Sequence, residues 1–134
     1  MSNANDMLAA TPAPIGFDRG QLAECINACF DCSQACAACA DACLAEEMVA
    51  EMRRCITTDA NCADICATTG RVLSRQTEYD AEVTRAMLVA CRDACRRCAE
   101  ECEQHAGMHD HCRVCAEACR RCERACAALL QATS

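Results

Sequence analysis

The sequence predicts an all-α protein, an antiparallel up-down-up-down four-helix bundle with a cysteine-lined core. Cysteines recur at alternating steps of four and three residues in several segments, which is the spacing of a helix face that points into a bundle. No run of residues alternates as a strand would, and the 134 residues include only four Gly and two Pro. The connections between the cysteine-rich segments are very short, which favours antiparallel neighbours.

The chain is expected to divide into a flexible N-terminal tail, residues 1–17, and a four-helix bundle domain, residues 18–134. The tail lacks the basic region of a secretion signal, and Pro12 and Pro14 interrupt its apolar stretch. No stretch approaches the length of a membrane span. These features predict a cytoplasmic protein, in which thiols are kept reduced.

The first helix has a clear start signal. Phe17 precedes Asp18, and Gln21 follows Asp18 by three residues, which matches a capping box with a hydrophobic staple. Gly107 is expected to serve as a C-cap before the last helix. The four helices are predicted over residues 18–45, 48–74, 78–106 and 108–131.

Composition places cysteine in the core and charge on the surface. The chain has 18 Cys, no Trp and 2% aromatic residues, so cysteine and alanine must fill most of the interior. Acidic and basic residues at helical spacing, such as Asp93 with Arg97 and Glu117 with Arg121, predict salt-bridged outer faces. The net charge of −7 argues against a nucleic-acid-binding protein, which would carry a basic face.

The cysteines are predicted to bind metal rather than to form disulfides. Dense cysteine in a reducing compartment indicates metal binding. The alternative, an exported protein stapled by disulfides, fits poorly because cysteines on one face of one helix have unsuitable disulfide geometry. A second alternative is that the cysteines are small core fillers, but Ala, Val or Leu would pack as well without the redox risk.

Sixteen of the cysteines form eight C-x-x-x-C pairs. Side chains at positions i and i+4 lie about 5–6 Å apart at Cβ, so that two sulfurs can clasp one ion in near-linear geometry. Cys55 and Cys112 remain single and are expected to pair across helices. The predicted thiolate ligands are Cys25, Cys29, Cys32, Cys36, Cys39, Cys43, Cys55, Cys62, Cys66, Cys91, Cys95, Cys98, Cys102, Cys112, Cys115, Cys119, Cys122 and Cys126.

Charge selects Cu(I) among the metals that thiolates favour, which are Cu(I), Zn and Fe–S clusters. Each Cu(I) replaces one thiol proton, so a core with roughly one Cu(I) per Cys gains no net charge, whereas unpaired buried charge would be prohibitive. A Zn(II) ion takes four thiolates and would leave each site with a charge of about −2. Fe–S clusters use compact loop spacings that this sequence lacks.

One end of the predicted bundle collects neutral imidazole and thioether ligands, because its two turns carry all the His and several Met. These side chains are expected to capture Cu(I) and pass it to the thiolates. The alternative is that they are ordinary helix-end residues. The predicted ligands at this end are His105, His109, His111, Met48, Met52 and Met108.

The other end is expected to be closed by an apolar plug. Met87 is expected to lie in the core stripe near that end. Between Cys55 and Cys62, either Thr58 or Asp59 falls on the core stripe, and the spacing is compatible with both. The predicted plug consists of Leu22, Leu73, Val83, Leu129 and Leu130.

Residues 18–131 resemble the bacterial four-helix-bundle copper storage proteins, in particular their cytosolic members. The resemblance rests on the C-x-x-x-C series from Cys25 to Cys43, on the matching stripes of the third and fourth helices, and on the lack of an export signal. It implies Cu(I) bound inside each bundle, copper storage or protection against copper toxicity, and a homotetramer of bundles. Copper donor or acceptor proteins would be its partners, without nucleic acid or membrane.

Two other function classes are disfavoured. A copper chaperone or sensor needs one or two exposed sites, whereas these ligands are expected to be buried. A thiol-redox enzyme needs one activated cysteine at a helix N-terminus near a strand, and none stands out. The chain is therefore predicted not to be an enzyme.

Overall fold

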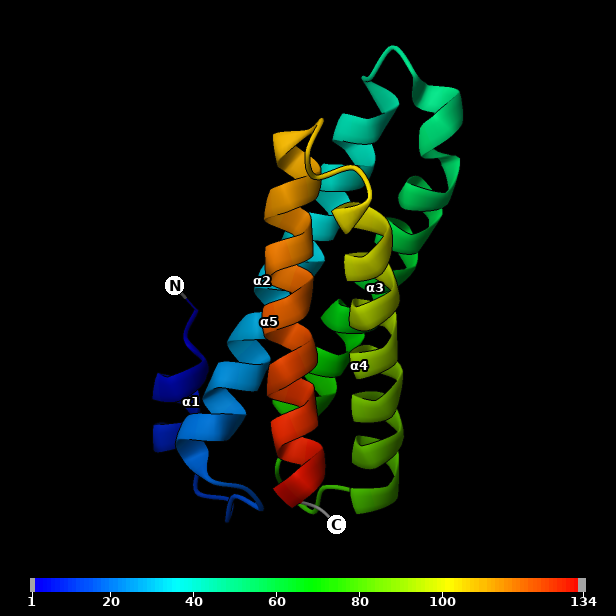
Figure 1. Ribbon diagram of the computed structural model, residues 1–134. Helices are drawn as coiled ribbons and strands as arrows, with labels where there is room; N and C mark the ends of the chain where they lie inside the picture. Colours follow the sequence, from blue (N-terminus) through cyan, green and yellow to red (C-terminus); the bar gives the residue numbers. More distant parts are fainter. Residues whose placement is uncertain (1, 133–134) are drawn as a thin grey trace.

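The computed structural model describes residues 2–132, which contain five α-helices, one 3₁₀ helix and no strand (Figure 1). Helices α2 to α5 form an antiparallel bundle in which α3 packs on α2, α4 on α3, and α5 on both α4 and α2. The predicted all-α bundle is confirmed, with one additional short helix before it. The elements are α1 (Ala4–Ala10), α2 (Arg19–Leu44), η1 (Val49–Met52), α3 (Arg53–Leu73), α4 (Ala81–Glu103) and α5 (Asp110–Ala132).

The start of α2 follows the predicted capping signal. Asp18 is the N-cap, and its carboxylate accepts a hydrogen bond from the Gln21 N–H at 2.9 Å. This bond satisfies one of the amide groups that the first turn leaves without a helical partner. Leu22, one turn into the helix, is fully buried.

Helix α4 ends earlier than predicted, and Gly107 is not its C-cap. The helix ends at Glu103 with Gln104 as C-cap in a right-handed conformation. The next amides turn back onto the last carbonyls, as in the bond from His105 N–H to the Cys102 carbonyl at 3.0 Å. No left-handed residue is therefore needed, and Gly107 does not adopt a positive φ.

The N-terminal segment differs from the flexible tail that was expected. Helix α1 packs along α2, and its Leu8 is buried. Beyond it, the Gly16 N–H donates to the Gln76 side chain at 3.3 Å, and Gly16 lies so close to the Tyr79 ring that a β-carbon would not fit. Seven residues are too few to show a helical period in the sequence, which explains the difference. The domain boundary at residue 17 stays a prediction.

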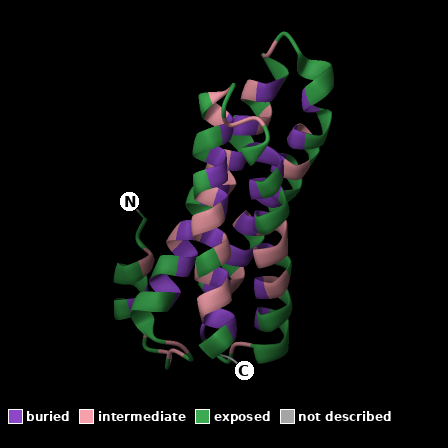
Figure 2. Ribbon diagram, in the orientation of Figure 1, coloured by how far each residue is buried: buried purple, intermediate pink, exposed green. Residues whose placement is uncertain are grey.

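The interior of the bundle is a set of continuous buried stripes, one on each long helix (Figure 2). At the end where α2 begins, four leucines close the interior, and we call this the closed end. Val83 was predicted there but is 51% exposed, and Met87 is only half-buried. Leu88 is buried instead, because it precedes Cys91 by three residues and so continues the stripe. The closed end is formed by Leu22, Leu73, Leu88 and Leu129.

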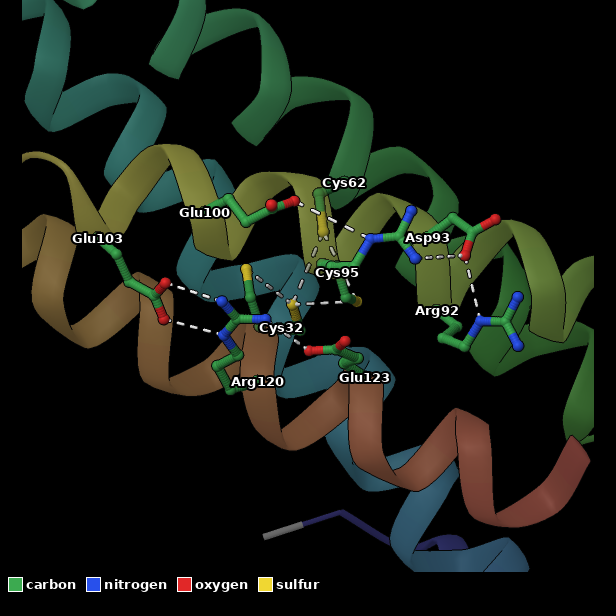
Figure 3. Close-up of polar contacts among 11 residues, drawn as sticks. Cys32, Cys62, Arg92, Asp93, Cys95, Glu100, Glu103, Arg120 and Glu123 are labelled. Carbon is green, nitrogen blue, oxygen red and sulfur yellow. Dashed lines mark hydrogen bonds and ion pairs between the residues drawn. The ribbon is translucent and has the colours of Figure 1, made fainter. Parts of the chain in front are cut away.

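The outer faces carry ion pairs, but with different partners from those predicted. Asp93 pairs with Arg92 and Arg96 rather than with Arg97 (Figure 3). Arg121 reaches across to Glu24 on α2 rather than to Glu117 on its own helix. Long arginine side chains span neighbouring helices as easily as one turn of their own helix. Such surface pairs each contribute about 0–1 kcal/mol.

Candidate metal centre

All 18 cysteines are buried, and none forms a disulfide. Each side chain is at most 1% exposed, because the alternating steps of three and four keep every sulfur on the inward face of its helix. Apart from Asp59 and Glu101, the charged residues between the cysteines are exposed or partly exposed, so that the thiols are separated from water by the helices themselves (Figure 3).

The sulfurs gather into groups of four that draw on several helices. Within each group, all sulfur atoms lie within 4.8 Å of one another. One group takes a single cysteine from each of the four long helices. Four of these groups are Cys29, Cys91, Cys122 and Cys126; Cys32, Cys66, Cys95 and Cys122; Cys32, Cys36, Cys62 and Cys119; and Cys36, Cys98, Cys115 and Cys119.

Successive groups share members, so the donors form one continuous array along the bundle. Cys122 belongs to the first two groups, Cys32 to the second and third, and Cys36 with Cys119 to the third and fourth. Figure 3 shows Cys32 in contact with Cys62 and Cys95, at 3.9 and 4.0 Å. A thiolate that lies in two groups can bridge two ions, which allows many ions to be held by few sulfurs.

The predicted C-x-x-x-C pairs are only part of this array. Sulfur contacts within one helix occur at Cys62–Cys66, at 3.7 Å, but most of the contacts join different helices, such as Cys25–Cys126 at 3.8 Å. Metal–thiolate bonds of about 2.3 Å place two sulfurs about 4.6 Å apart around a linear ion and about 4 Å apart around a three-coordinate one. The observed spacing is thus closer to that of three- or four-coordinate ions.

The two single cysteines also lie against other helices. Cys55 is 3.9 Å from Cys102 on α4, and Cys112 is 4.0 Å from Cys39 on α2. Each of them therefore has a neighbouring sulfur on another helix, although α3 carries only three cysteines.

Asp59, and not Thr58, faces the core. Its Oδ1 accepts hydrogen bonds from the thiols of Cys98, at 3.0 Å, and of Cys102 and Cys115, both at 3.4 Å. Burial, and then the nearby sulfurs of Cys115 and Cys98, raise the pKa of Asp59 to about 10. The carboxyl group is therefore neutral at neutral pH, as an acid without a cationic partner in an apolar core must be.

Burial keeps two thiols near the start of α5 protonated. At the α2–η1 end it raises the pKa of Cys43 above the ordinary value and that of Cys112 to about 12. A thiol in this environment loses its proton only when a cation takes its place, because the bare thiolate would be a buried charge.

The end of the bundle where the α2–η1 and α4–α5 connections meet is the mouth (Figure 1). Here His111 joins the thiols. Its Nδ1 is 3.4 Å from the sulfur of Cys39 and 3.6 Å from that of Cys112. With Cys43, these residues form a group whose donor atoms all lie within 4.8 Å. The mouth therefore offers a mixed set of one imidazole and three thiols.

A single carboxylate links two histidines of the mouth. Glu46 Oε2 lies 2.8 Å from His111 Nε2 and 3.0 Å from His109 Nδ1. The two imidazole rings are stacked, with centroids 5.4 Å apart. The hydrogen bond from His111 lowers the pKa of Glu46, so that this side chain is a carboxylate at neutral pH. His109 Nε2 is buried and has no hydrogen-bond partner.

The other predicted residues of the mouth lie in three settings. His105 Nε2 is 3.1 Å from a carboxylate oxygen of Glu101, which also pairs with Arg54. Met52 is fully buried at the start of the α3 stripe. Met48 and Met108 are exposed, and Met48 lines a surface hollow together with His109.

Comparison with known proteins agrees with this geometry. Residues 18–131 match the sequence family described as Csp, copper storage protein. The chain belongs to the copper storage protein family. One relative in this comparison is an uncharacterised cysteine-rich protein of Bacillus subtilis (strain 168), YhjQ, which is 37% identical over 105 residues that make up 78% of this chain and 92% of the relative.

Solved structures of another copper storage protein, Ccsp from Streptomyces lividans, share the fold. Ccsp loaded with 10 copper equivalents has a TM-score of 0.93 and 58% identity, over 96% of this chain and 98% of its own. A structure from copper loading of this cytosolic protein, with five coppers, has a TM-score of 0.82 and 60% identity over 84% and 93%. A variant with one histidine replaced by alanine has a TM-score of 0.87 and 58% identity over 89% and 99%.

Within residues 2–132, no helix combines the length and the apolar character that a membrane span requires.

One residue of the mouth, Glu46, was not among the predicted site residues of this family member. A signal for it exists, because Cys39, Cys43 and Glu46 continue the steps of four and three. Glu46 lies one residue beyond the predicted helix 18–45, where the periodic pattern is no longer expected to apply. Its role depends on α5 lying opposite, which only the folded bundle shows.

Proposed function

We propose that this protein stores Cu(I) in the cytoplasm, sequestering many ions on its buried cysteines, which protects the cell against copper toxicity or holds copper for cuproenzymes. The observation that carries the proposal is the array of four-sulfur groups with shared members. A protein that handles one ion at a time has no use for donors along the whole length of its core.

The ligands are the thiolates of all 18 cysteines, and the capacity is roughly one Cu(I) per Cys. Charge balance supports this ratio. Each Cu(I) that enters displaces one thiol proton, so the interior stays neutral at every stage of filling. Neutral Asp59 fits the same requirement, because it adds no charge beside Cys98 and Cys115.

Copper reaches the thiolates through the mouth. The imidazoles of His105, His109 and His111 and the thioethers of Met48, Met52 and Met108 receive Cu(I) and pass it inward. Support comes from His111, whose Nδ1 lies beside the sulfurs of Cys39 and Cys112. Among the described residues, the closed end carries leucines and two buried threonines, Thr69 and Thr84, on its stripes, and no imidazole or thiol beyond the cysteine array.

The copper-binding domain comprises residues 18–134. Four copies assemble as a homotetramer of bundles. This assembly exchanges copper with donor or acceptor proteins. The family resemblance supports the assembly, and light scattering on the reduced protein tests it. We assign the chain no catalytic role, since a storage protein needs only to bind and release its cargo.

An anaerobic titration of the fully reduced protein with Cu(I), in competition with a chromophoric chelator, tests the proposal. The expected result is tight binding of roughly one Cu(I) per Cys. Saturation at one or two ions would instead indicate a chaperone or sensor. Thiols that prove to be already paired as disulfides would also overturn the proposal.

A further inference from the structure

We propose that Glu46 is a positioning residue of the mouth, whose carboxylate fixes the tautomers of His109 and His111 so that each imidazole keeps a lone pair for incoming Cu(I). This inference rests on the proposed function, because it assigns Glu46 a task in copper uptake.

The backbone places Glu46 opposite the start of α5. It follows the last residue of α2 by two positions, and its N–H donates to the Cys43 carbonyl at 3.3 Å. This bond fixes the turn at the end of the cysteine stripe. From there the side chain reaches the two histidines, which flank the first residue of α5, Asp110.

The contacts of the carboxylate determine where the imidazole hydrogens lie. Oε2 is 2.8 Å from His111 Nε2 and 3.0 Å from His109 Nδ1. A carboxylate only accepts hydrogen bonds, so each of these ring nitrogens must donate. A neutral imidazole has one N–H, and its other nitrogen then carries the lone pair that binds metal.

The two free nitrogens are those that suit copper. In His111 the lone pair is on Nδ1, which faces the sulfurs of Cys39 and Cys112 at 3.4 and 3.6 Å. In His109 it is on Nε2, which is buried without a hydrogen-bond partner. Glu46 thus selects opposite tautomers in the two stacked rings. The lone pair of His111 faces the thiols, and that of His109 has no hydrogen-bond partner.

Without this carboxylate, the hydrogen of His111 is free to move to Nδ1, where it would point at the thiols and block the metal. The next residue, Glu47, carries the same charge in the same turn but is exposed. Both residues line a hollow of about 590 Å³ at the surface, together with Met48 and His109. Glu47 is therefore a matched control for the simple attraction of a cation by negative charge.

The experiment measures uptake of chelator-buffered Cu(I) by anaerobic stopped-flow mixing, in the wild type and in Glu46→Ala, Glu46→Gln and Glu47→Ala at constant pH. Partners that orient a metal-binding histidine typically change metal affinity or activity by about 10–100-fold, so Glu46→Ala is expected to slow uptake of the first captured ion by roughly tenfold. Glu46→Gln keeps an accepting oxygen and is expected to stay closer to the wild type. Glu47→Ala is expected to change binding far less than Glu46→Ala.

Nitrogen-15 NMR of the imidazoles in the reduced, copper-free protein provides a readout that a loss of packing would not produce. The expected spectrum shows N–H at Nε2 of His111 and at Nδ1 of His109, with both assignments lost or mixed in Glu46→Ala. Unchanged tautomers in that variant, or identical uptake by Glu46→Ala and Glu47→Ala, would overturn the inference. If the wild type binds many ions and every variant takes up copper at the wild-type rate, storage stands while positioning fails; if the wild type binds only one or two ions, both proposals fall.

Discussion

The closed end and the mouth are the two ends of the same four helix stripes, and they differ only in the side chains that occupy the stripe positions. At the closed end these positions hold Leu22, Leu73, Leu88 and Leu129. At the mouth they hold sulfur donors, with His111 and Glu46 beside them. The steps of three and four residues continue without a break between the ends. The fold therefore requires a buried side chain at each step. Whether that side chain ends in a methyl group or in a sulfur atom decides whether that end of the bundle can bind metal.

The largest expected effect is the stabilisation of the thiol array by copper. A ligand that binds only the folded chain stabilises it by about 4 kcal/mol at 1,000 times its Kd, and several ions add to this. The melting temperature of the reduced protein should rise strongly on loading with Cu(I), and a strong Cu(I) chelator should reverse the change. Anaerobic calorimetry makes the measurement, and equal melting temperatures would refute copper binding within the fold.

The next largest effect is expected at the closed end. Leu129→Ala removes a fully buried side chain and should lower the free energy of unfolding by about 2–5 kcal/mol. It should leave the Cu(I) capacity unchanged, because leucine supplies no ligand. Urea unfolding and chelator-competition titration test the two parts separately.

Val83→Ala is the matched control for the closed end, since Val83 is 51% exposed. Its effect on the free energy of unfolding should stay within about 0.5 kcal/mol. A loss equal to that of Leu129→Ala would show that the plug extends to Val83. A loss of copper capacity in Leu129→Ala would remove the distinction between the two ends.

A smaller effect, on rate rather than on capacity, is expected at the mouth. His111→Ala should slow Cu(I) uptake by roughly tenfold, which corresponds to about 1.4 kcal/mol in the barrier, while the total number of bound ions changes little. Stopped-flow mixing measures the rate. Met7→Ala, on the exposed side of α1, is the control and should match the wild type. Equal rates for both variants would mean that copper does not pass by His111.

The smallest effect is expected on the outer face, where the Arg120 guanidinium pairs with Glu103 at 2.8 Å. The hydrogen bond from Arg120 lowers the pKa of Glu103, so this pair stabilises the fold above the ordinary carboxyl pKa and loses its contribution as pH falls through the lowered value. Because both side chains are partly exposed, Arg120→Ala should cost less than about 1 kcal/mol at pH 7.

That cost should shrink as the pH falls below the ordinary carboxyl pKa and through the lowered pKa of Glu103, and urea unfolding at several pH values follows it. Arg124→Ala, an exposed arginine on the same helix, should have no such pH dependence. A pH-independent loss in Arg120→Ala would assign its effect to packing of the side chain rather than to the ion pair.

The sequence predicted most of the bundle because one periodic signal governs it. From the end of η1 along α3, the buried residues follow steps of three and four without interruption: Met52, Cys55, Asp59, Cys62 and Cys66. The same alternation selects Asp59 over Thr58. The spacing to Cys55 and Cys62 alone does not decide between them, because Thr58 and Asp59 each lie three or four residues from both cysteines.

Other parts of the molecule depend on contacts that no local pattern contains. Helix α1 is too short to have a period, and it is held by packing on α2. The pairing of Glu46 with two histidines joins residues more than 60 positions apart and arises only when the bundle brings the turns together.

Counting the protons released as Cu(I) binds tests most directly the exchange of copper for thiol protons in a neutral core. The measurement is an anaerobic pH-stat titration of the reduced protein at neutral pH. Release of roughly one proton per Cu(I), constant from the first ion to saturation, is the predicted result, since buried thiols hold their protons until metal replaces them. Negligible release, or release that stops while copper still binds, would contradict a core that fills without gaining charge.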